Sequence, residues 1–327
     1  MHPKKRLQRQ WYVVLLGILT PVLVLNAIAF MQARAMTHFV TTRQRTAKPE
    51  SLSLVDKMRV VLTGVKLPRP INQRSPQNFH LAYETHRIPI TDREFLETWF
   101  IPAQSSQGIV LLFPPYAASK EVLLKSALIL HELGYDTLLV DFRGVGGSSG
   151  SDTTLGVREA KDVAIAFTYA RSYWSDRPII LYGASMGSVA VMRAIAHEKI
   201  SPTAVILESP FERLLNTVRH RFEAMGLPSF PGAELIVFWG GVQQHIDGFA
   251  HNPVEYAKAI ECPTLLMYGE LDKRVTLLEV QAIFDSLSGQ KQFVTFAAFG
   301  HGSLAGEDAF KWRQQVQQFL FSNRSKV

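Results

Sequence analysis

Residues 179–196 read IILYGASMGSVAVMRAIA, and this stretch decides the fold. The apolar run 179–182 predicts a strand, the small residues after it predict a tight turn, and the remainder has a helical pattern. Ser185 stands at the apex of that turn, where a strained backbone exposes the hydroxyl at the carboxyl end of the sheet. Gly183 and Gly187 are the small neighbours that such a turn requires. We expect Ser185 to be a nucleophile; the alternative is a serine in an ordinary strand-to-helix loop.

Short apolar runs and helical segments alternate on both sides of this turn. An antiparallel pair, 79–88 and 94–101, is expected first. The further strands are expected at 108–113, 137–140, 203–207, 264–268 and 292–297, and the further helices at 120–133, 157–173, 277–287 and 309–321. Such alternation predicts an α/β fold with a mostly parallel central sheet and helices on both faces.

One stretch, residues 209–252, interrupts the alternation with prolines, several aromatic residues and a pair of glycines. An insertion after the carboxyl end of a strand lies over that end of the sheet. We therefore interpret it as a small helical lid that governs specificity. The alternative is that its aromatic residues pack a surface helix onto the sheet.

A catalytic serine needs a base, and a carboxylate that fixes the tautomer of that base. His301 follows the last expected strand and is flanked by glycines that permit a tight turn toward the strand ends. Asp272 follows strand 264–268 at its carboxyl end. We predict that Ser185, Asp272 and His301 form a catalytic triad, in the chain order serine, acid, histidine.

Several other residues compete for these roles. Glu270 is the nearest rival acid and Glu208 the next, whereas Asp141 is expected to fix the Gly-rich loop 143–150 through Arg143. The rival histidines are His131 and His197, late in helical patterns, and His245 and His251, in the expected lid.

The oxyanion formed on attack requires two preorganised donors. The backbone N–H of Met186, at the positive end of the helix, is the first candidate. The second is expected from the loop that follows strand 108–113, which reads PPYAA from Pro114. Neither proline has an N–H, so Tyr116 is the candidate.

The charge distribution and the cysteine content bear on the partners and cofactors that the protein can have. The net charge is +7, but residues 1–48 hold eight Lys or Arg and no acid, which leaves 27 basic and 28 acidic residues in the remainder. The folded domain therefore has no basic excess, and no nucleic-acid partner is expected. The single cysteine, Cys262, excludes an intramolecular disulfide, no metal-ligand spacing is present, and we expect neither a metal nor another cofactor.

Residues 11–31, WYVVLLGILTPVLVLNAIAFM, are uncharged and about long enough to cross a bilayer as a helix. We interpret them as a retained anchor after a basic N-terminus, 1–10, followed by a linker, 32–78, and the catalytic domain, 79–323. The close-packed basic residues before the span favour a cytoplasmic N-terminus and an extracytoplasmic domain. The alternative is a signal peptide cleaved after the small-x-small residues 33–35.

These residues together resemble the α/β-hydrolase superfamily, nearest to its serine aminopeptidase-like and prolyl-oligopeptidase-like hydrolases. The resemblance covers about residues 80–322. Its landmarks are the loop 113–120, the DFRGVGGS motif at 141–148, the GASMG elbow at 183–187, the YGELD motif at 268–272 and the GHG motif at 300–302. It implies Ser185 as nucleophile, Asp272 as acid, His301 as base, and Met186 and Tyr116 as oxyanion donors.

Two positions depart from the usual family pattern: Pro114-Pro115 replaces a His-Gly pair, and Lys273 replaces a proline after the acid. Members of the fold include esterases, lipases, thioesterases, peptidases and acyltransferases, and membership does not choose among them. We expect a membrane-anchored serine hydrolase that cleaves carboxylic esters through an acyl-enzyme, with a small-molecule or lipid-like acyl substrate. The alternatives are a peptidase, thioesterase or acyltransferase with the same triad, or a non-catalytic tethered protein of the same fold.

Overall fold

The computed structural model describes residues 3–42, 46–47 and 52–323 and is built around one eight-stranded sheet. Its strand order is β1-β2-β4-β3-β5-β6-β7-β8, and β3 to β8 are joined by parallel pairings. The strands are β1 (Glu84–Pro89), β2 (Phe95–Ile101), β3 (Ile109–Phe113), β4 (Asp136–Val140), β5 (Ile179–Ala184), β6 (Ala204–Glu208), β7 (Thr264–Gly269) and β8 (Lys291–Phe296). The predicted α/β fold with a mostly parallel sheet is confirmed.

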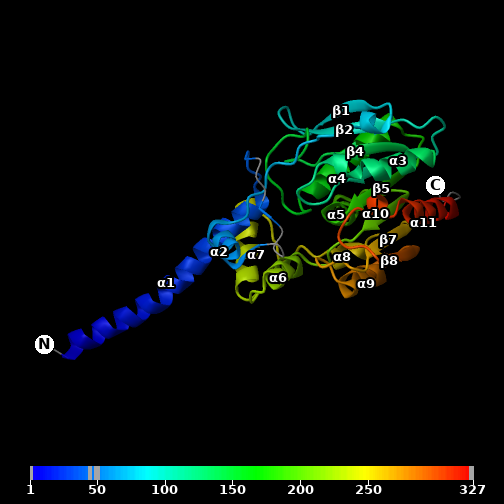
Figure 1. Cartoon of the computed structure of the whole chain (residues 1–327). Coiled ribbons are helices and arrows are strands. Elements are labelled where there is room, and N and C mark those ends of the chain that lie inside the picture. Colours follow the sequence, from blue (N-terminus) through cyan, green and yellow to red (C-terminus); the bar gives the residue numbers. More distant parts are fainter. Residues whose placement is uncertain (1–2, 43–45, 48–51, 324–327) are drawn as a thin grey trace.

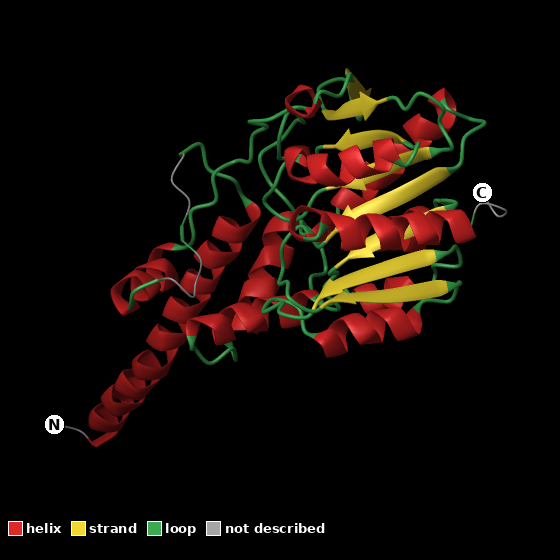
Figure 2. Ribbon diagram, turned by 45° about the vertical axis from the view of Figure 1, so that its right-hand side comes forward, coloured by secondary structure: helices red, strands yellow, loops and turns green. Residues whose placement is uncertain are grey.

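Helices cover both faces of this sheet (Figure 2). One core includes buried residues of α4 (Glu159–Tyr173), α5 (Met186–Glu198), α8 (Pro253–Ala257) and α9 (Leu277–Ser286). The other includes buried residues of α3 (Leu124–Glu132), α10 (Leu304–Glu307) and α11 (Ala309–Ser322). Strands β3, β4 and β6 are buried along their whole length, as expected of parallel strands covered on both faces.

The N-terminal helix is longer than the apolar stretch 11–31 predicts. Helix α1 runs from Pro3 to Thr37 and projects away from the sheet (Figure 1). We expected a linker from residue 32, but residues 32–37 continue the helix because Ala29 and Ala33 are buried where α1 packs on α7. The expected linker range also contains α2 (Leu54–Thr63) and the 3-10 helix η2 (Pro76–Phe79). Residues 43–45 and 48–51 of this range, and residues 1–2 of the basic N-terminus, lie outside the described residues.

The interrupting stretch 209–252 forms two helices, α6 (Leu214–Met225) and α7 (Gly232–Gln244). Figure 1 shows both beside α1 and α2, at one end of the sheet. The indole of Trp239 on α7 packs edge-on against Phe30 of α1 and donates a hydrogen bond of 3.0 Å to the Asn26 side chain. This aromatic residue therefore joins α7 to the N-terminal helix and not to the sheet.

Candidate active site

Ser185 occupies the turn between β5 and α5 with φ 51° and ψ −112°. Positive φ is unfavourable for a residue with a side chain, so close packing must hold this conformation. A Cβ on Gly183 would lie 2.4 Å from the nitrogen of Ser188, and one on Gly187 would lie 2.2 Å from the carbonyl oxygen of Phe113. Both glycines are therefore required for the close approach of strand, turn and helix.

His301 connects Ser185 to Asp272. Its Nε2 lies 2.9 Å from the Ser185 hydroxyl oxygen, and its Nδ1 lies 2.5 Å from Oδ2 of Asp272. The carboxylate has no donor, so Nδ1–H donates to it and Nε2 is left to accept the serine proton. The Asp272 side chain is fully buried and the His301 side chain is 14% exposed, so the acid is shielded from water while the ring keeps a small accessible surface.

The backbone after β7 holds the carboxylate of Asp272 in place. Its Oδ1 accepts hydrogen bonds from the backbone N–H groups of Arg274 at 2.8 Å and of Val275 at 3.1 Å. This turn is closed by the aspartate itself, so Lys273, where the family usually has proline, leaves the acid fixed.

One expected oxyanion donor lies in the elbow itself, and the other lies in the loop that packs against it. Met186 is the first residue of α5, where a backbone N–H has no carbonyl within the helix to bind. Tyr116 belongs to the loop that follows β3, the strand beside β5, and a Cβ on Gly187 would lie only 2.8 Å from the oxygen of Pro114 in this loop. The Pro114-Pro115 loop thus packs directly against the elbow.

The side chain of Tyr116 contacts the N-terminal helix, which no sequence pattern predicted. Its hydroxyl donates a hydrogen bond of 2.6 Å to the carbonyl oxygen of Met36, at the end of α1, and the Arg221 guanidinium lies 5.3 Å from the centre of its ring. Nearby, the Thr153 hydroxyl donates a weak hydrogen bond of 3.7 Å to the sulfur of Met186, and the Thr153 backbone N–H donates to the carbonyl oxygen of Thr37. The end of α1 is therefore attached to the surroundings of both candidate donors.

The rival acids and bases lie in other environments. Glu270 is exposed to solvent. Glu208 is buried, which raises its pKa to about 7, and its carboxylate accepts a hydrogen bond of 2.5 Å from the indole N–H of Trp312. His251 is buried against Tyr256 and the carbonyl of Leu155. The remaining rivals have other contacts: His131 with the Pro102 carbonyl, His197 with the Tyr256 ring, and His245 at the end of α7.

The interpretation of Asp141 needs a correction. Arg143 does not bind it but pairs with the buried Asp162 at 2.7 Å. Asp141 instead accepts from the fully buried ammonium of Lys120 at 2.5 Å and from the backbone N–H of Gly147, in the Gly-rich loop, at 3.0 Å. Lys120 lies 21 residues away at the start of another element, so sequence proximity pointed to the wrong cation.

The described residues contain no group of three or more His, Cys, Asp or Glu side chains that could hold a metal ion. Burial raises the pKa of the Cys262 thiol to about 12, so this thiol is uncharged and a poor nucleophile at neutral pH.

Comparison with known proteins gives a family model, relatives and solved structures that match this chain. The family model described as serine aminopeptidase, S33, matches residues 104–230. The chain is 25% identical over 279 residues to lysophosphatidylserine lipase ABHD12 from Danio rerio, and this alignment covers 73% of this chain and 70% of that protein. It is 22% identical over 257 residues to protein bem46 from Schizosaccharomyces pombe, covering 77% and 81%. An esterase structure from Pyrococcus furiosus matches with a TM-score of 0.65 at 22% identity, covering 78% of this chain and 96% of that one.

The matches to the vertebrate lipases span from 42% to 70% of their length. The sheet order, the elbow at Ser185 and the solved structures that superpose on it define the fold of an α/β hydrolase. The chain therefore has the α/β-hydrolase fold, and the family model that matches its central part is that of a group of serine hydrolases, the serine aminopeptidases.

Proposed function

We propose that the protein hydrolyses carboxylic esters, with Ser185 as nucleophile, His301 as general base and Asp272 as the acid that orients it. The observation that carries this proposal is the continuous hydrogen-bond path from Asp272 through His301 to Ser185. A serine hydroxyl becomes a useful nucleophile only when a base is in contact with it and a third group holds that base in the right tautomer.

The proposed reaction has two halves. Oγ of Ser185 attacks the ester carbonyl while its proton passes to Nε2 of His301, and the buried Asp272 carboxylate stabilises the imidazolium. The backbone N–H groups of Met186 and Tyr116 bind the oxyanion. His301 then protonates the leaving alcohol, and a water molecule activated by the same ring releases the acid from Ser185.

Two observations favour a lipid-like acyl ester. The relatives include proteins named as a lysophosphatidylserine lipase and an esterase. Helix α1 contains a segment, Leu15–Thr37, that is long and apolar enough to cross a membrane. We propose that α1 is a single-pass anchor that keeps the catalytic domain, residues 79–323, on the extracytoplasmic side of the membrane. Residues 209–252 would form the lid of this domain.

The test is active-site labelling of the detergent-solubilised full chain with a fluorophosphonate, followed by hydrolysis of p-nitrophenyl butanoate. Ser185→Ala should abolish both signals, because the fluorophosphonate reacts only with an activated serine. The control is Ser322→Ala, which changes an exposed serine at the end of α11. This variant should be labelled by the fluorophosphonate and should hydrolyse the ester like the wild type.

Labelling of the wild type at any residue other than Ser185, or turnover retained by a folded Ser185→Ala protein, would reject the triad. No label in a folded wild type would favour the non-catalytic alternative. Acyl transfer to an alcohol uses the same residues and is distinguished by ester product formed when the alcohol is added.

A further inference from the structure

Helix α2 presents its apolar side chains to the outside of the molecule. Four of them, which we call the α2 face, share about 100° of the helix circumference. These residues are between 56% and 81% exposed: Leu54, Val55, Met58 and Leu62. No residue of α2 is buried. A helix that only covered a soluble domain would turn such a stripe inward, so the α2 face requires an apolar partner.

The other side of α2 is attached to the rest of the protein. The Lys57 ammonium donates a hydrogen bond of 3.2 Å to the carbonyl oxygen of Met225, at the end of α6. The side-chain amide of Gln32, on α1, donates to the carbonyl oxygens of Val60 and Val61. These contacts determine which side of α2 faces outward.

Helix α2 is attached to α1 where the apolar segment of α1 ends. The uncharged stretch 11–31 is about 32 Å long as a helix, close to the thickness of the hydrocarbon core of a bilayer. Gln32 follows this stretch directly, and Arg34 is the first charged residue after it. A bilayer that holds residues 11–31 in its core therefore has its surface at the residue of α1 to which α2 is bonded.

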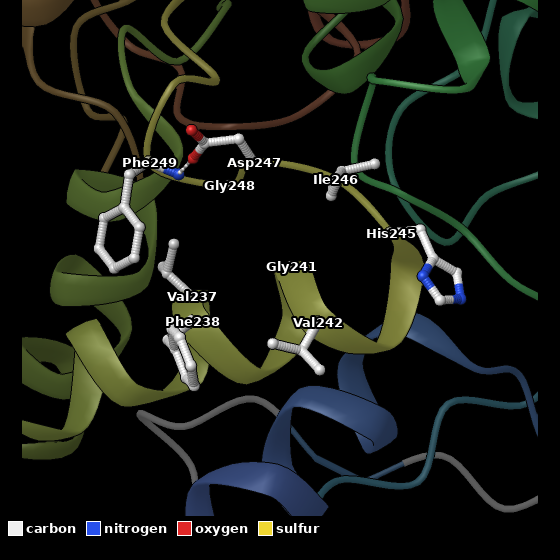
Figure 3. Close-up of a pocket in the computed structure, with 9 residues that line it drawn as sticks. All are labelled: Val237, Phe238, Gly241, Val242, His245, Ile246, Asp247, Gly248 and Phe249. Atoms are coloured by element: carbon white, nitrogen blue, oxygen red, sulfur yellow. Dashed lines mark hydrogen bonds between the residues drawn. The ribbon is translucent and has the colours of Figure 1, made fainter.

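Helix α7 presents a second apolar surface beside the same part of α1. Its Trp239 contacts Asn26 and Phe30 of α1, and tryptophan is enriched where proteins cross the membrane surface. Phe238 and Val242 are each 49% exposed. Figure 3 shows both on one side of α7, a turn apart, beside the hollow between α7 and its following loop. Both helices that pack on the end of the apolar segment thus carry exposed apolar side chains.

We propose that the α2 face, together with Phe238 and Val242, rests on the surface of the bilayer that α1 crosses. The proposal goes beyond ester hydrolysis and rests only on the single-pass anchor proposed above. Continuity with α1 favours the bilayer over a protein partner or a second copy of the chain, because α2 is bonded to the residue at which the apolar segment ends. The second contact would keep the domain from swinging about α1.

The test measures the depth of α2 in the full chain, reconstituted in phosphatidylcholine vesicles. Cys262 is the single cysteine, so Cys262→Ala followed by Met58→Cys leaves one thiol for a nitrobenzoxadiazole fluorophore. Phospholipids that carry a nitroxide near the headgroup, or deep in the acyl chain, quench such a probe according to its depth. We expect the shallow nitroxide to remove about half of the emission and the deep one less, because interfacial helices lie about 5–10 Å into the boundary. Leu54→Cys tests the other end of the same face.

The matched control is Phe321→Cys in the same background. Phe321 is as exposed as Met58, at 68% against 67%, but lies on α11, on the other side of the molecule from α1 (Figure 1). Its probe should not be quenched. Leu19→Cys, in the middle of the apolar segment, reports on the anchor and should be quenched most by the deep nitroxide. Circular dichroism of each variant reports folding without reference to activity.

If the Leu19→Cys probe is quenched and the Leu54→Cys and Met58→Cys probes are not, the surface contact is overturned and the anchor stands. Stronger quenching of Met58→Cys by the deep nitroxide would also overturn it, since α2 would then lie in the hydrocarbon core. Equal quenching of Phe321→Cys would do the same, because the contact would not be confined to one face. An unquenched Leu19→Cys probe would reject the anchor and the surface contact together, whereas a failure of ester hydrolysis would leave both intact.

Discussion

His251 is a fully buried histidine whose two ring nitrogens lie 3.0 Å from the Tyr256 hydroxyl and 3.1 Å from the Leu155 carbonyl oxygen. Burial lowers its pKa from 6.5 to about 4, and the nearby Arg193 cation adds to this effect, while Glu159 opposes it. The folded protein therefore holds this ring neutral over a range in which the unfolded chain binds a proton.

This histidine makes stability depend on pH with a defined sign. Between pH 6.5 and about 4 the unfolded state binds more protons at His251, so the free energy of unfolding decreases as the pH falls, by about 3 kcal/mol for the full shift. Buried Glu208 and Asp162 have raised pKa values and act in the opposite sense. The measurement is therefore a difference between wild type and variant.

We expect His251→Gln to be less stable than the wild type at pH 7, because it loses packing in the core. On acidification to pH 4.5 its disadvantage should shrink, since it has no ring to protonate. Urea unfolding in detergent at both pH values measures this. A stability difference that stays constant or widens at pH 4.5 would mean that His251 is not held neutral.

At the scale of elements, the site depends on how closely α5 approaches the loop after β3. Gly187→Ala would place a methyl group 2.2 Å from the Phe113 oxygen and 2.8 Å from the Pro114 oxygen, both backbone atoms. The loop that carries Tyr116 would have to move away from the elbow.

We expect Gly187→Ala to lower the free energy of unfolding by about 1–3 kcal/mol, the usual cost of overpacking, and to lower kcat for butanoate ester more than it raises KM. Gly17→Ala is the control, because nothing lies within 4 Å of its added Cβ. Steady-state kinetics with urea unfolding measures both quantities. Wild-type kcat in Gly187→Ala would show that the loop position does not limit catalysis.

At the scale of the whole molecule, α1 combines a part that packs on the folded domain with a segment, Leu15–Thr37, that is long and apolar enough to cross a membrane. Its last turns are buried against α7, and the Gln32 amide donates to the carbonyl oxygens of Val60 and Val61 in α2. Residues 33–35, where the alternative of a signal peptide would place the cleavage, lie inside this packed part of the helix. Cleavage there would remove Ala29 and Gln32 and open the interface, so the structure favours a retained helix.

A retained α1 predicts that the protein stays in the membrane fraction through high-salt and carbonate washes and dissolves only in detergent, since its exposed apolar residues hold it in the bilayer. N-terminal sequencing of the purified protein provides the control. Release by carbonate, or a mature N-terminus near Met36, would contradict this prediction.

The sequence by itself determined the α/β class, the turn at Ser185 and the strand ends from which Asp272 and His301 project. These features are local: apolar runs, glycines and chain order specify them within a few residues. The partner of Asp141 and the contact between Tyr116 and Met36 were decided only by tertiary structure. They join residues 21 and 80 positions apart, and no local pattern encodes which distant segments meet.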